Sequence, residues 1–80
     1  MFKNGDIVLC TGNFEDNDTG GKIGKVVDIW RDSYKIGFFD KLKRSNDDGW
    51  RYVGKYPDVK SIWWVRSYLI KSPVSKNKFK

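Results

Sequence analysis

Apolar and polar residues alternate in several short runs along this chain, and the alternation has the period of a β-strand. Each run is rich in β-branched or aromatic residues and is bounded by polar or glycine-containing segments. No window of ten or more residues has the spacing of an amphipathic helix. The pattern predicts a small all-β domain with strands at 6–11, 23–30, 34–40, 50–54 and 62–66 and one short helical turn at 67–71.

Turn-forming residues between the runs indicate how the strands connect. The tight connection at 31–33 joins two neighbouring runs, so 23–40 is expected to form a hairpin. Gly24 lies inside a run and is expected to mark a bulge or bend. Pro57 keeps the segment 55–61 out of a central strand. Five short strands in 80 residues favour a strongly bent sheet that closes into a barrel.

The alternation assigns faces to the two adjacent tryptophans near the end of the chain. Neighbouring side chains on a strand point to opposite faces, so Trp63 and Trp64 cannot both enter one core. If Val65 and Leu69 seal the barrel, Trp63 points inward with Val65. On the run at 50–54, aromatic side chains of alternate residues are also expected to fill the interior, and these are Trp50 and Tyr52.

The same alternation places Ile62, Trp64 and Arg66 on the outer face. An outward tryptophan beside an outward arginine has two explanations. Trp64 is covered by the loop at 40–49 or by the C-terminal tail, or it is a contact residue for a partner. Trp and Arg are the residue types most enriched at binding hot spots, which makes the second explanation worth testing.

Three short motifs resemble those of a known group of folds. They are Gly5-Asp6-x-Val8, Gly21-x-x-Gly24-x-Val26, and Trp64-Val65 followed by Leu69. Over roughly residues 5–70 the chain is similar to SH3-like barrels, including KOW-type domains and repeats of the MIB and HERC kind. The resemblance implies a five-stranded all-β SH3-like barrel at 1–71, with a short helical turn near the C-terminus. The residues that follow, 72–80, form a basic tail that we expect to be mobile.

The chain departs from that group in two places. Its loop at 40–49 is long, and its C-terminal end is basic. It also lacks the acidic, aromatic-rich loop by which SH3 domains bind proline-rich peptides. The resemblance therefore implies the fold more than any one function.

Charge is distributed unevenly along the chain. The net charge is +6, but residues 1–40 carry a net −2 and residues 41–80 a net +8. Such asymmetry suggests an anionic partner for the second half. Its basic residues alternate with aromatic ones, as in small barrels that bind single-stranded nucleic acid. The candidate contact residues are Lys41, Lys43, Arg44, Arg51, Ile62, Trp64 and Arg66.

Catalytic and metal chemistry have little support. The chain has no histidine and one cysteine, so it lacks the usual catalytic base and cannot form an internal disulfide. Cys10 alternates with apolar residues and is expected to be a packed thiol. The segment 16–21 begins like a calcium loop, but Val27 stands where the bidentate glutamate is needed. We expect no enzyme activity, no cofactor and no metal.

Two functions remain for a non-catalytic binding module. The first is binding of a protein partner, because a surface with charges of both signs is common in protein recognition. The outward Trp64 and Arg66, the small size and the absence of catalytic groups motivate this hypothesis, and a phage-type inhibitor or modulator of a host protein is one form of it. The absence of Ala and the abundance of Lys, Asn, Asp, Ile and aromatic residues resemble proteins from AT-rich bacterial or phage genomes, which concerns the source and not the function. The alternative is a barrel that contacts DNA or RNA through its basic second half. We expect a cytoplasmic protein with no membrane partner and no small-molecule substrate.

Overall fold

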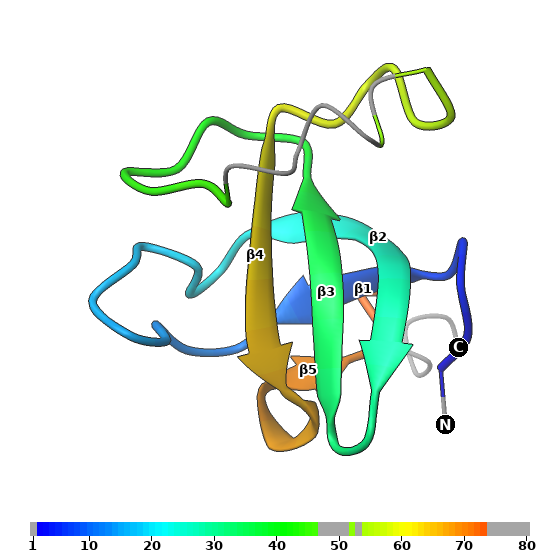
Figure 1. Cartoon of the computed structure of the whole chain (residues 1–80). Helices are drawn as coiled ribbons and strands as arrows, with labels where there is room; N and C mark the ends of the chain where they lie inside the picture. The colour runs from blue at the N-terminus through cyan, green and yellow to red at the C-terminus, as the bar shows by residue number, and fades with distance from the viewer. Residues whose placement is uncertain (1, 47–51, 53, 74–80) are drawn as a thin grey trace, which may run out of the picture.

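An antiparallel sheet of five strands forms the domain (Figure 1). The computed structural model describes residues 2–46, 52 and 54–73. The strand order is β4-β3-β2-β1-β5. The strands are β1 (Ile7–Cys10), β2 (Ile23–Trp30), β3 (Ser33–Phe38), β4 (Ser61–Arg66) and β5 (Ile70–Lys71), and a 3-10 helix, η2 (Ser67–Leu69), joins β4 to β5.

The sheet is strongly curved, and most of its bend lies in the long strand β2 (Figure 1). The N-terminal strand β1 pairs with the C-terminal strand β5, with Leu9 opposite Lys71 and Cys10 opposite Ile70. β4 and β5 are the two edges of the described sheet. The all-β prediction is confirmed, whereas closure into a barrel stays a prediction.

A bulge in β2 lies at Val27 rather than at Gly24, where the sequence suggested it. The register with β3 shifts between Val26 and Asp28, while Gly24 pairs regularly with its neighbours on both sides. Gly24 has a different role. A Cβ atom at Gly24 would lie 2.5 Å from the carbonyl oxygen of Gly37. The glycine therefore permits β2 and β3 to approach closely at the bend.

The predicted strand at 50–54 is not found at the two of its residues that the structure describes. Trp50, Arg51 and Val53 lie outside the described residues, and Tyr52 and Gly54 are not in the sheet. The fifth strand is instead β5, which has only two residues. A two-residue strand is too short to show a periodicity in the sequence. β5 is recognised only by its pairing with β1, which is distant in the sequence.

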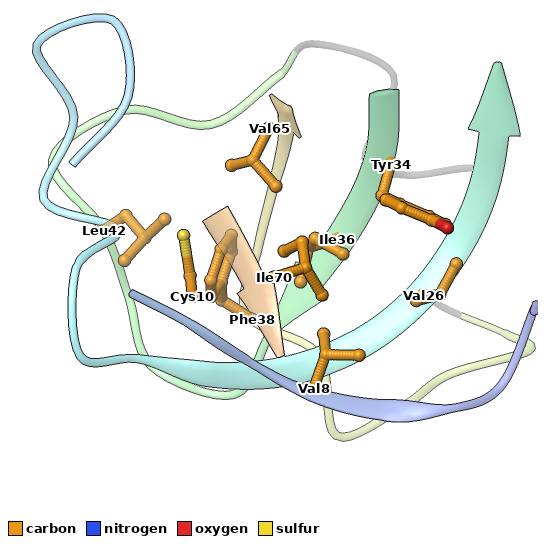
Figure 2. Packing of buried hydrophobic residues seen from close by; sticks show 9 residues of the cluster. All are labelled: Val8, Cys10, Val26, Tyr34, Ile36, Phe38, Leu42, Val65 and Ile70. Atoms are coloured by element: carbon orange, nitrogen blue, oxygen red, sulfur yellow. The ribbon is translucent and has the colours of Figure 1, made fainter. Parts of the chain in front are cut away.

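The main core lies on the concave face of the sheet. Figure 2 shows its side chains directed toward one another from strands that are distant in sequence. Cys10 is buried there as a packed thiol, and Val65 and Trp63 face this core as the alternation predicts. The main core consists of Val8, Cys10, Val26, Tyr34, Ile36, Phe38, Leu42, Val65 and Ile70, with Phe2, Phe14, Trp63 and Leu69 packed against it.

A second apolar group, the outer cluster, covers part of the convex face. It consists of Val27, Tyr56 and Ile62, with Tyr52 and Val59 packed against them. Ile62 does point to the outer face, but it is only 2% exposed because the segment 54–60 folds over it. The prediction of Ile62 as a surface contact is therefore wrong. Tyr52 likewise packs on the outer side instead of in the main core.

Among the described residues, no helix has the length and apolar character needed to cross a membrane.

Candidate partner-binding site

Three aromatic side chains line an open hollow on the outer face, beside the edge strand β4. Its volume is about 360 Å³, within the range of small ligand pockets. We call it the aromatic hollow, and its lining residues are Phe14, Glu15, Trp30, Ser33, Trp64 and Arg66.

The sheet register explains why four of these residues meet. Ser33 on β3 lies opposite Trp30 on β2 and opposite Arg66 on β4, so the three residues form one row across the sheet. Residues directly opposite each other in an antiparallel sheet share a face. Trp64 stands two residues before Arg66 and therefore lies on the same face. Because Ser33 is small, it leaves a depression between the larger side chains of the row.

The buried Lys35 supports one side of Trp64. Lys35 lies opposite Trp64 in the register and is only 4% exposed. Its Nζ atom is 5.4 Å from the centre of the Trp64 ring and 5.1 Å from that of Tyr52, and it donates a hydrogen bond to the Tyr52 hydroxyl at 3.4 Å. Cation–π contacts of a desolvated ammonium are stronger than exposed ones. Trp64 is thus half-buried, with its position fixed by the lysine.

The turn between β2 and β3 positions the other tryptophan. Trp30 is 62% exposed, a large fraction for this residue type. The Arg31 guanidinium stacks on the Trp30 ring at 4.7 Å, and Arg31 has a φ of 57°, in the left-handed region. A hydrogen-bonded ion pair links Arg66 to Asp32 at 3.3 Å. Both arginines therefore help to order the side chains of the hollow.

A tight turn at Phe14–Asn17 forms the opposite wall. Both central residues, Glu15 and Asp16, have positive φ values of 53° and 59°, and the Asn17 N–H donates to the Phe14 carbonyl at 3.2 Å. These are the features of a type I′ turn, which usually contains Asn-Gly. Each left-handed non-glycine residue costs roughly 1 kcal/mol, so the rest of the fold must stabilise this turn.

Asn17 supplies that stabilisation by joining the turn to the loop that precedes β4. Its side chain is buried and bonds to both main-chain groups of Arg44, donating to the carbonyl at 3.1 Å and accepting from the N–H at 3.0 Å. The Trp63 indole N–H also donates to the Phe14 carbonyl at 3.2 Å. The wall of the aromatic hollow is therefore attached both to the basic loop and to β4.

Asp18 makes a second link to the same loop. The Lys43 main-chain N–H donates to Asp18 Oδ1 at 2.8 Å, and this bond holds the pKa of the Asp18 carboxyl below its ordinary value of 3.8. The Lys22 ammonium, 3.6 Å away, acts in the same direction with a smaller effect.

The structure separates the predicted contact residues into two groups. Trp64 and Arg66 lie together in the aromatic hollow. Lys41, Lys43 and Arg44 are all exposed on the loop that Asn17 and Asp18 anchor, and none of them lines the hollow. Arg51 lies outside the described residues, and Ile62 is buried beneath the outer cluster.

Sequence reasoning missed Trp30 and Phe14. A two-residue turn at 31–32 would have placed Trp30 opposite Ser33, and this was the available signal. No local pattern shows that a turn more than forty residues away in sequence comes to lie beside Trp64. Within the described part of the chain, no group of three or more Cys, Asp or Glu residues is arranged to bind a metal ion.

Comparisons with known proteins do not assign a family. No family model matches the chain, and neither the curated proteins nor the solved structures gave a match. The resemblance to SH3-like barrels therefore stays a prediction.

Proposed function

We propose that this protein is a non-catalytic module that binds a protein partner through the aromatic hollow. The observation that carries the proposal is the exposed Trp30 beside the half-buried Trp64 and the ordered Arg66. Trp and Arg dominate the energy of many protein interfaces because they combine a large contact area with hydrogen-bond donors. A phage-type inhibitor or modulator of a host protein is one setting that suits such a module.

The charges around the hollow support a protein partner over a nucleic acid. Glu15 lines the hollow, Asp16 follows it in the same turn, and Asp32 pairs with the nearby Arg66. A phosphate backbone placed here would approach the Glu15 and Asp16 carboxylates and be repelled. A surface with charges of both signs instead fits the polar rim of a protein interface.

The test compares partner capture by variants that keep the fold. Trp30→Ala removes an exposed side chain and should reduce binding to the partner captured by the wild-type chain at least about thirtyfold, as expected for a hot-spot tryptophan. Tyr68→Ala is the matched control, because Tyr68 is 76% exposed and does not line the hollow. Equal binding by Trp30→Ala and wild type would contradict the proposal.

Nucleic-acid binding is the second candidate, and the exposed basic loop at 41–44 favours it. Lys41, Lys43 and Arg44 present three exposed cations. The main chain of Lys43 is fixed by Asp18 and that of Arg44 by Asn17. Fluorescence anisotropy with short DNA and RNA at two salt concentrations tests it. Affinity that falls steeply with salt, and that is lost in a Lys43→Glu/Arg44→Glu variant, would support it. Absence of binding at low salt would exclude it.

A further inference from the structure

The edge strand β4 has unpaired main-chain groups beside the aromatic hollow. At Ile62 the edge is already occupied, because the Ile62 N–H donates to Ser45 Oγ at 2.9 Å and its carbonyl accepts from the Asn46 N–H at 2.8 Å. Main-chain groups two residues apart on a strand point the same way, so those of Trp64 also face away from β3. Neither group has a hydrogen bond to any residue that the structure describes.

An added strand would place a side chain in the hollow. A residue paired with Trp64 would exchange both main-chain hydrogen bonds with it, as in other cases of strand addition to a sheet edge. Its side chain would lie on the same face as the Trp64 ring, and this is the face that carries the hollow. The same partner residue would therefore pair its main chain with Trp64 and place its side chain in the aromatic hollow.

The charges of the hollow select a basic side chain. The Glu15 carboxylate forms no ion pair with the described residues, whereas Arg66 is already paired with Asp32. The uncompensated charge in the lining is therefore negative. Arg31 already contacts one face of the Trp30 ring and Lys35 one face of the Trp64 ring, so an added cation would contact the opposite faces. A lysine or arginine can cover these rings with its apolar stem while its charged end reaches the carboxylate.

We infer that the β4 edge at Trp64 binds an extended segment of a partner protein, which pairs its main chain with Trp64 and places a lysine or arginine side chain in the aromatic hollow. The inference rests on the proposed function and names the chemistry of the partner. It also gives a role to the strained turn at Glu15 and Asp16, since this turn carries the carboxylate to the open edge.

The probe for this inference is a blocked pentapeptide, Thr-Val-Lys-Val-Thr, titrated into isotopically labelled protein and followed by NMR. We expect shifts of the Trp64 amide and the Trp30 indole N–H. Replacing the central lysine by glutamate should weaken binding at least about tenfold, and so should methylating its main-chain nitrogen, which removes one paired donor.

Two protein variants distinguish the effect of the Glu15 charge from the effect of any change in the turn at Glu15 and Asp16. Glu15→Gln should remove most of the preference for lysine over glutamate. Asp16→Asn is the matched control, because it removes one charge from the same turn at a residue that does not line the hollow. It should retain the preference.

Several outcomes would overturn the inference. These are equal binding of the lysine and glutamate peptides, unchanged binding of the methylated peptide, or shifts centred on the loop at 41–44. Shifts of the Trp64 amide with protein concentration alone would identify a second copy of this chain as the occupant. If no peptide binds while Trp30→Ala still loses the captured partner, the inference fails and the proposed function stands. If Trp30→Ala captures the partner normally, the proposed function fails.

Discussion

Single polar side chains fix the geometry around the aromatic hollow. Asn17 satisfies both main-chain groups of Arg44 from a buried position, and Asp18 accepts from the N–H of the preceding loop residue, Lys43. Buried polar groups without partners are costly, so these bonds hold the two loops in one arrangement. Sequence analysis placed no strand or helix in this segment and could not identify the partners, because they lie at least 25 positions away.

Asp18 should make the link between the loops dependent on pH. Its pKa is lowered in the folded state, chiefly by the Lys43 N–H, so its contribution to stability is present above the unfolded pKa and is lost as the pH falls through the folded pKa. NMR titration of the Asp18 carboxyl should give a pKa below 3.8. Asp18→Asn keeps an acceptor oxygen but cannot titrate, so it should reduce the loss of stability in acid.

Lys22→Met tests the assigned cause. It removes the smaller electrostatic effect and leaves the Lys43 bond, so most of the lowering of the Asp18 pKa should remain. A return of the pKa to its ordinary value in Lys22→Met would show that the ion pair dominates instead.

Individual strands were predictable where alternation was long and uninterrupted. The run at 23–30 coincides with β2, and the hairpin to β3 is confirmed, because its connection is short and local. The outer face was harder to predict. Ile62 has the orientation that alternation gives it, yet it is buried, because no local pattern shows that the segment 54–60 folds back over β4.

The bend in β2 should depend on the missing side chain at Gly24. An added Cβ would lie 2.5 Å from the Gly37 carbonyl oxygen and 2.8 Å from Ile36 Cγ2. Gly24→Ala should therefore reduce the free energy of unfolding by about 1–3 kcal/mol, the usual range for overpacking. Urea unfolding monitored by tryptophan fluorescence would measure the change.

Gly54→Ala provides the control for that prediction. A Cβ at Gly54 meets no atom within 4 Å, so the unfolding midpoint should change little. Equal midpoints for the two variants would show that the strands separate without cost and would contradict the role given to Gly24.

At the scale of the molecule, the described residues form two apolar groups on opposite faces of one sheet. The main core joins β1, β2, β3, β4 and β5, whereas the outer cluster attaches the segment 54–60 to the convex face. Smaller clusters that cover one segment often open without global unfolding. We therefore expect the outer cluster to open independently of the main core.

Hydrogen exchange should detect this independence. Tyr56→Ala should accelerate exchange of the Val59 and Lys60 amides at least about tenfold, which corresponds to about 1.4 kcal/mol of opening free energy. These amides bond to Tyr56 and Phe38 carbonyls. The Ile36 amide in the main core should change much less. A uniform acceleration at all sites would show one cooperative unit.

The pairing of β1 with β5 has a mechanical consequence. The two strands are antiparallel, with Leu9 opposite Lys71. The chain therefore enters β1 and leaves β5 at the same end of this strand pair. A force that pulls these two strands apart would load their hydrogen bonds one after another instead of shearing them together. The domain should therefore begin to unfold at low force by separation of β5 from β1, although this pair is part of the sheet.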